Sequence, residues 1–91
     1  MVRDNGQMQE ALFREILKLQ TLEECKLFFD DLCTIKELDA MCQRVVAARM
    51  LLDGKTYNEI IEQTDISSAT LSRVSKCVQY GEGYRSILNK Q

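Results

Sequence analysis

Histidine and proline are both absent from this 91-residue chain, and each absence narrows what the protein can be. Histidine is the side chain most often used as a general base near neutral pH, and it is a common ligand of zinc. Cysteine does not replace it, because no two cysteines stand in a CxxC spacing. The cysteines are Cys25, Cys33, Cys42 and Cys77. No glycine-rich nucleotide loop is present either, so we expect no metal, no cofactor and no enzymatic activity.

Long apolar runs are also missing from the sequence. No run of about 18 apolar residues is present, so we expect no transmembrane helix and no membrane partner. The first ten residues, MVRDNGQMQE, are too polar for a signal peptide. These features predict a cytoplasmic protein, in which the cysteines stay reduced. Each cysteine has apolar neighbours in the sequence, so we expect all four to be small core residues.

The lack of proline and of alternating apolar residues predicts a single small all-α domain over residues 1–91. Threonine precedes glutamate by three residues at three places, as in a capping box, where each side chain binds a free backbone amide of the helix start. The three pairs are Thr21 with Glu24, Thr34 with Glu37, and Thr56 with Glu59. Apolar periodicity and these caps predict about six helices. Their approximate ranges are 7–19, 22–32, 35–53, 57–63, 67–79 and 84–88.

The helix expected from Ile35 to Asp53, ended by Gly54 in the left-handed conformation, is apolar on several sides. Its main stripe consists of Leu38, Met41, Cys42, Val45, Ala48 and Leu52. Val46, Ala47, Met50 and Leu51 lie on its other sides. A chain this short cannot cover such a helix alone, so we expect a homodimer. Arg49 interrupts the stripe and fits either an ion pair with Glu23 or Asp30 or a phosphate contact.

Residues 55–79 have the dimensions of a helix-turn-helix, with Thr64-Asp65-Ile66 as the turn. At about 100° per residue, the second helix has Leu71, Val74 and Val78 on one face. Its opposite face carries Ala69, Ser72, Arg73 and Lys76, with Ser68 at one edge. Short side chains let a helix N-terminus approach a groove closely, and hydroxyls can bond phosphates or base edges. Asp65 stands where many such motifs have glycine, and it can adopt the left-handed conformation at some cost.

The charge distribution allows a DNA-binding function although the net charge is −2, because residues 66–81 contain two bases and no acid. We predict a transcriptional regulator, a repressor, that binds double-stranded DNA sequence-specifically. Its candidate DNA-binding residues are Thr56, Tyr57, Ser67, Ser68, Ala69, Thr70, Ser72, Arg73 and Lys76. The alternative is a helical protein–protein adaptor that uses this surface without DNA. It is supported by the small number of bases and by Glu59 and Glu62, which would repel phosphate.

These residues resemble the Trp repressor superfamily, and most closely its TrpR-related YerC/YecD group of small bacterial proteins. The resemblance extends from the first helix through Tyr84 and is strongest from Thr34 through Lys76. It rests on Gln43-Arg44-Val45-Val46, on Leu51-Leu52-Asp53-Gly54 and on Ala69-Thr70-Leu71-Ser72-Arg73. It implies six helices in an intertwined homodimer. Residues 1–54 would form core and dimerisation helices, 55–79 the helix-turn-helix, and 80–91 a C-terminal helix.

The resemblance also implies an effector pocket, because Thr34, Arg44 and Arg73 match residues that contribute to the tryptophan pocket of the Trp repressor. Val74 and Cys77 depart from that pattern, since they stand where the repressor has a glycine beside the ligand and a serine that helps to hold it. A valine would fill space that the ligand needs, so tryptophan is not the expected effector. Another small anion and no effector at all both remain open. Arg73 can face DNA or the core, and Arg44 also fits a surface salt bridge.

Overall fold

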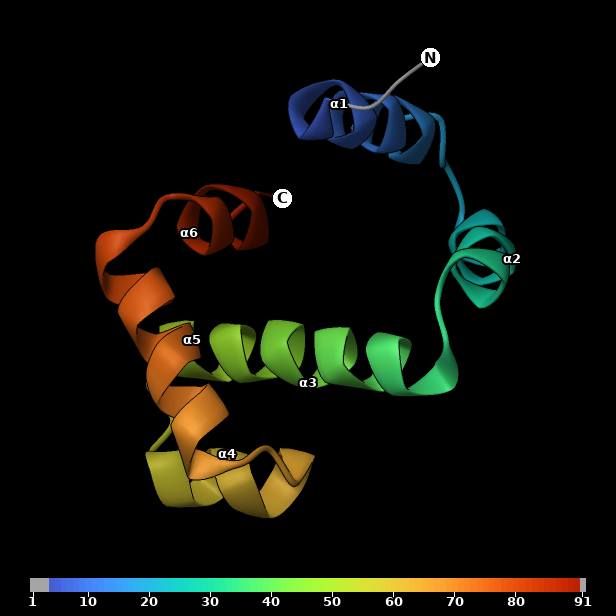
Figure 1. Ribbon diagram of the computed structural model, residues 1–91. Helices are drawn as coiled ribbons and strands as arrows, with labels where there is room; N and C mark the ends of the chain where they lie inside the picture. Colours follow the sequence, from blue (N-terminus) through green and yellow to red (C-terminus); the bar gives the residue numbers. More distant parts are fainter. Residues whose placement is uncertain (1–3, 91) are drawn as a thin grey trace. The chain divides into compact units, whose positions relative to one another are not determined.

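The structure, a computed structural model, describes residues 4–90, which form six helices and no strand, so the all-α prediction is confirmed (Figure 1). The helices are α1 (Asn5–Ile16), α2 (Leu22–Leu32), α3 (Ile35–Leu52), α4 (Tyr57–Thr64), α5 (Ser68–Tyr80) and α6 (Gly83–Leu88). The chain divides into two compact units, the first ending at Thr34 and the second beginning at Ile35. Among these helices none is long and apolar enough to cross a membrane.

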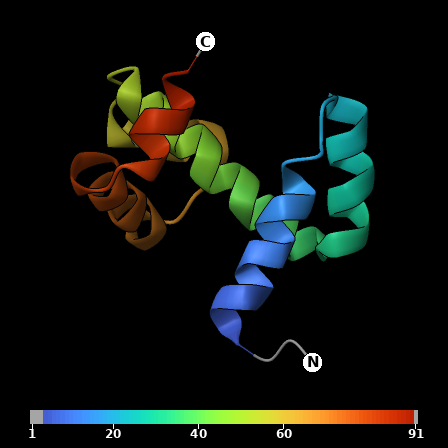
Figure 2. The same cartoon turned by 90° about the horizontal axis from the view of Figure 1, so that it is seen from above.

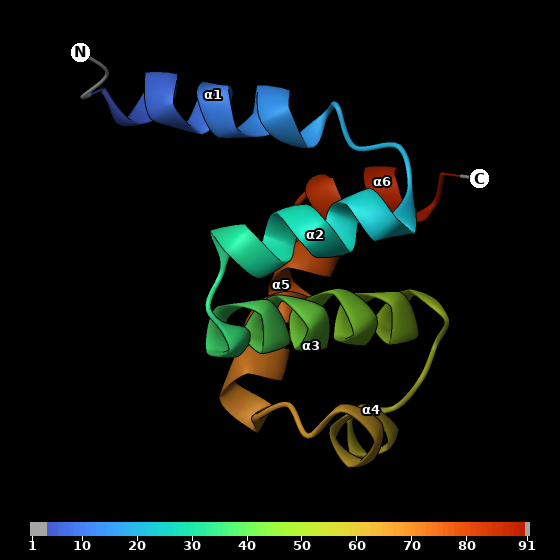
Figure 3. The ribbon, with the colours of Figure 1, turned by 90° about the vertical axis from the view of Figure 1, so that its right-hand side faces the viewer.

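The first unit consists of α1 and α2, joined by residues 17–21 (Figure 3). Asp4 caps α1, because its carboxylate accepts hydrogen bonds from the amides of Gly6 at 2.7 Å and Gln7 at 3.4 Å. The helix therefore begins two residues before the predicted start. It ends earlier than predicted because the amides of Lys18 and Leu19 bond to carbonyls three residues back, which tightens the chain into a turn.

The capping boxes at Thr21 and Thr56 are confirmed. The Glu24 amide donates to Thr21 Oγ1 at 3.0 Å, and the Glu24 carboxylate accepts from the Thr21 amide at 3.2 Å. Thr56 and Glu59 make the same reciprocal pair, with both distances at 3.2 Å. These contacts fix the starts of α2 and α4 at the predicted residues. The box predicted at Thr34 stays a prediction.

The first unit has no buried residue between positions 4 and 34. Leu17, Leu22 and Leu27 are 82%, 89% and 70% exposed. Phe28 and Phe29 pack edge to face, with ring centroids 5.7 Å apart, but both remain half-buried. Two helices with this much exposed apolar surface gain little free energy of folding from each other.

The second unit is built on α3, against which α5 packs most extensively, with additional contacts from α4 and α6. Figure 1 shows α5 crossing α3, with α4 near one end of α5 and α6 near the other. Seen from above, α6 lies over the C-terminal part of α3 (Figure 2). Gln43 Nε2 of α3 also donates to the Thr64 carbonyl at the end of α4, at 3.2 Å. The core consists of Ala47, Ala48, Met50, Ile60, Ile66, Leu71, Val74 and Val78.

The side of α3 that faces this core differs from the predicted stripe. Of that stripe only Ala48 is fully buried, whereas Val45 is 46% exposed. Ala47 and Met50, predicted for other sides, are buried because they belong to the core cluster that α3 forms with α4 and α5. Val46 is also 48% exposed, so the second unit alone leaves one side of this helix uncovered.

The prediction that all four cysteines are core residues is wrong for Cys42 and Cys77, which are exposed. Cys25 and Cys33 are half-buried. All four are free thiols. Sequence neighbours do not determine burial here, because Cys42 and Cys77 lie on sides of α3 and α5 that the core does not cover. In residues 4–90 no group of three or more cysteines and acids could hold a metal ion.

Two left-handed residues end helices, as predicted. Gly54 has φ 83° and closes α3 in a Schellman motif, in which its amide donates to Leu51 O at 3.1 Å and the Lys55 amide donates to Met50 O at 3.0 Å. Asp65 has φ 60° and ends α4, with its amide bonded to Ile61 O at 2.9 Å. Asp65 thus takes the place of the glycine found in many such turns.

We expect Gly54→Ala to lower the free energy of unfolding by about 1–2 kcal/mol, because alanine is strained at positive φ. Gly83→Ala is the matched control, since a Cβ at either position meets no atom within 4 Å and only Gly54 has a positive φ. The control should be neutral or stabilising by up to about 1 kcal/mol. Urea unfolding at equal protein concentration measures both, and equal effects would contradict the prediction.

Candidate nucleic-acid interface

The N-terminus of α5 is fixed by a serine cap. Ser67 Oγ accepts a hydrogen bond from the Thr70 amide at 3.1 Å and donates its own proton to Thr70 Oγ1 at 2.9 Å. Both hydroxyls are thus engaged with each other at the start of the helix. Ser67 and Thr70 therefore hold the start of the helix. The amides of Ser68 and Ala69, which come before the Thr70 amide, have no acceptor within the helix.

One face of α5 is buried in the core. Leu71, Val74 and Val78 are 0%, 2% and 7% exposed, on the face that the helical wheel predicts. Ser75 is buried beside them, and its hydroxyl accepts a hydrogen bond from Gln79 Nε2 at 3.2 Å, which satisfies the polar group. The buried face fixes which side chains point away from the core.

The opposite face of α5 carries short side chains, followed by a lysine. Ser68, Ala69, Ser72 and Lys76 are all exposed. Lys76 forms no ion pair with any residue between positions 4 and 90, so its charge is available to a ligand. Tyr80 is 84% exposed and continues this face one turn beyond Lys76. The sequence interpretation missed Tyr80, although its i+4 spacing from Lys76 indicates the shared face.

The two predicted DNA-binding residues of α4 lie at its N-terminus. Thr56 is exposed, but its hydroxyl and its amide are both engaged in the capping box with Glu59. Tyr57 is 42% exposed and stands at the first position of the helix. Glu62 is exposed as well. The surface of α4 thus presents one aromatic hydroxyl and two carboxylates.

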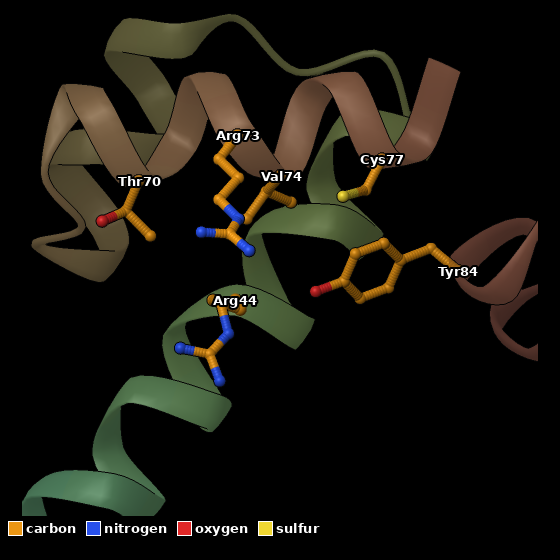
Figure 4. A pocket seen from close by; sticks show the side chains of 6 residues that line it. All are labelled: Arg44, Thr70, Arg73, Val74, Cys77 and Tyr84. Carbon is orange, nitrogen blue, oxygen red and sulfur yellow. The ribbon is translucent and has the colours of Figure 1, made fainter. Parts of the chain in front are cut away.

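A cavity of about 480 Å³ lies between α3, α5 and α6. It is lined by Arg44, Thr70, Arg73, Val74, Cys77 and Tyr84 (Figure 4). The side chain of Arg73 extends from α5 toward α3, on the side where Arg44 lies. Arg73 is also exposed, so the predicted choice between DNA and the core stays a prediction.

Two guanidinium groups and no carboxylate line this cavity, so it is electropositive. The structure brings together four of the five residues predicted for an effector pocket. The fifth, Thr34, belongs to the other unit, and its place in a pocket stays a prediction. Tyr84 completes the lining and was not predicted, because it comes from a helix after the helix-turn-helix and only the tertiary structure brings it here.

The fold and this surface define a helix-turn-helix protein, and the chain belongs to the Trp repressor family. The family model described as Trp repressor protein matches residues 7–91, which confirms the predicted resemblance. The chain is similar to the Bacillus subtilis (strain 168) protein named Uncharacterized protein YerC. The two are 48% identical over 86 residues, which cover 93% of this chain and 83% of the relative.

Two solved structures share the fold. A crystal structure of a candidate Trp repressor from Staphylococcus aureus has a TM-score of 0.87 and 42% identity, and the match covers 93% of this chain and 86% of that one. A TrpR-like protein from Eubacterium eligens ATCC 27750 has a TM-score of 0.85 and 43% identity, with 90% and 86% covered.

We expect calorimetry to detect no binding of tryptophan to the wild-type protein, because Val74 forms part of the cavity wall. Val74→Gly should not by itself create a tight tryptophan site, since Cys77 remains. Val74 is 2% exposed in the core, so the same substitution should also lower stability by about 2 kcal/mol or more. A micromolar dissociation constant for tryptophan and the wild type would refute this view of the cavity.

Proposed function

We propose that the protein is a transcriptional regulator, a repressor, that binds double-stranded DNA sequence-specifically as a homodimer, with α4 and α5 as the reading head. The observation that carries this proposal is the division of α5 into two faces. Its core face is almost fully buried, and its outer face starts with Ser68 and Ala69 and continues with Ser72 and Lys76. Membership in the Trp repressor family supports the same function.

The outer face suits a major groove because of the size and chemistry of its side chains. Ala69 and Ser72 are short, so the backbone of α5 can come close to base edges, where an alanine contacts a thymine methyl and a hydroxyl bonds a base. Lys76, one turn beyond Ser72, has the reach of a phosphate contact. Ser68 lies at the N-terminus, where the helix dipole also favours phosphate.

The remaining predicted residues take other roles in this proposal. Tyr57 can reach a phosphate through its hydroxyl at the start of α4. Thr56, Ser67 and Thr70 act mainly through the caps that hold α4 and α5. Arg73 extends into the cavity beside Arg44, so we exclude it from the base-reading set.

The homodimer is supported by the apolar surface that one chain leaves exposed. The first unit buries none of its described residues, and Val45 and Val46 of α3 are half-exposed. Burying apolar surface stabilises a fold by about 25 cal/mol per Å², so a second copy is the direct way to cover these helices. A two-fold dimer also places two reading heads on two half-sites of a palindromic operator.

We expect a stable dimer at micromolar concentration, measured by analytical ultracentrifugation. Because folding and association are coupled, the melting temperature should rise with protein concentration. Leu22→Ser, on the exposed side of α2, should weaken the dimer, whereas Lys26→Ser on the same helix, also exposed, is the matched control. A folded monomer at micromolar concentration would refute the dimer.

The second test separates phosphate contacts from base contacts on α5, using a site selected from random DNA with the purified protein. Lys76→Ala should weaken binding to all sequences alike and reduce the slope of log K against log salt by about one unit per half-site. Ser72→Ala should mainly relax discrimination at one base pair, at a cost of roughly 1–3 kcal/mol there. Fluorescence anisotropy at several salt concentrations measures both.

Lys55→Ala is the control, since Lys55 is an exposed lysine before α4 that lies outside the proposed reading face. It should change the salt slope less than Lys76→Ala does. If Lys76→Ala and Ser72→Ala both leave site and non-site affinities within about twofold, α5 is not a reading head. A wild type that binds mixed DNA without a negative salt slope would favour the protein–protein adaptor instead.

A further inference from the structure

We infer that Tyr84 is a positioning residue for the reading helix: its ring, carried by α6, acts as a permanent spacer between α3 and α5. The spacer sets the angle of α5 without any small molecule. This inference rests on the proposed function, because it concerns how α5 is presented to DNA. Its structural half, the effect of the ring on α5, can be tested in the absence of DNA.

Among the described residues that line the electropositive cavity, Tyr84 is the only one that belongs neither to α3 nor to the helix-turn-helix. Figure 4 shows its ring extending from α6 into the space between α5 and α3, with the hydroxyl directed toward the side of the arginines. The residue is half-buried and packs against the core cluster. It also lines the adjoining apolar cavity, so its ring forms a boundary between the two spaces.

The position of the ring is fixed because α6 is held to both helices that the ring separates. Arg49 of α3 donates a guanidinium hydrogen bond to the carbonyl of Leu88 at the end of α6. Arg85 of α6 donates to the Gln79 carbonyl near the end of α5, at 3.5 Å. Leu88 packs against the core from the same helix. The ion pair and the phosphate contact predicted for Arg49 both stay predictions.

The connection between α5 and α6 is also restricted. Gly81 ends α5, and a Cβ at this position would lie 2.7 Å from the carbonyl oxygen of Cys77, closer than real Cβ atoms come. Only glycine therefore allows the chain to leave α5 on this path. Because the connection consists only of Gly81 and Glu82, the direction of α6 is coupled directly to the end of α5.

A spacer at this place affects DNA recognition through geometry. Two reading heads must match half-sites about 34 Å apart, so a small rotation of α5 on α3 moves base-contacting side chains out of register. Contacts with phosphates tolerate such a shift better, since they carry no sequence information. Loss of the ring should therefore reduce affinity for the selected site much more than affinity for mixed DNA.

The experiment compares Tyr84→Ala, Tyr84→Phe and the wild type, with p-cresol, the tyrosine side chain without its backbone, as the probe. Tyr84→Ala should lose about tenfold or more in site affinity, with mixed-DNA affinity and salt slope nearly unchanged. Millimolar p-cresol should restore site affinity to Tyr84→Ala and leave the wild type unaffected, because it refills the space that the ring leaves at the edge of the adjoining apolar cavity. Tyr84→Phe, which keeps the ring, should bind like the wild type.

The DNA-free readout is the set of backbone amide chemical shifts of α5 in the free dimer. They should move in Tyr84→Ala and return toward wild-type values with p-cresol. Unchanged α5 shifts in Tyr84→Ala would overturn the role of the ring. A loss of site affinity that p-cresol does not restore in Tyr84→Ala, and that Tyr84→Phe also shows, would overturn it as well. If the α5 shifts respond as expected but the wild type binds no DNA site, the proposed function fails and the role of Tyr84 as a spacer is retained.

Tyr84→Leu, which keeps most of the side-chain volume, replaces Tyr84→Ala should the alanine variant not fold.

Discussion

The close packing of α5 across α3 is the contact on which the rest of the second unit depends. Ala47 and Ala48 are both fully buried in the core cluster that these two helices share. Alanine lets two helix backbones approach more closely than leucine or methionine would. A larger residue at either position would disturb this packing, and with it the placement of the outer face of α5.

The other helices of this unit hold α5 in place against α3 at its two ends. At one end, Gln43 and the core residues Ile60 and Ile66 hold α4 and the turn against α3. At the other end, α6 is bonded to α3 through Arg49 and to α5 through Arg85. The orientation of α5 therefore results from contacts that involve none of its outer-face residues.

Local sequence signals predicted the helices well because their physical causes are local. The Thr56 and Glu59 pair fixes the start of α4 through two hydrogen bonds, and Gly54 ends α3 because positive φ suits glycine. The start of α1 was missed because its cap is Asp4 and not a threonine paired with a glutamate. The buried face of α5 followed from three apolar residues at helical spacing.

Tertiary contacts were predicted less well, because periodicity does not say which neighbour covers a given side. On α3, with apolar residues on several sides, the stripe containing Val45 looked as suitable for the core as the side containing Ala47. Cys77 has apolar sequence neighbours but faces a cavity rather than the core. The sequence around Tyr84 does not indicate that this residue lines the cavity, since its position follows from the path of the chain after Gly81.

The two faces of α5 also bear on how such a protein changes over evolutionary time. Residues of the outer face, such as Ala69 and Ser72, are exposed and contribute little to the core, so substitutions there leave folding largely intact. Residues of the inner face are constrained by packing and change rarely without loss of stability. Under the proposed function, duplicated copies of this chain can therefore diverge in operator preference by single substitutions, while the scaffold that presents these side chains remains the same.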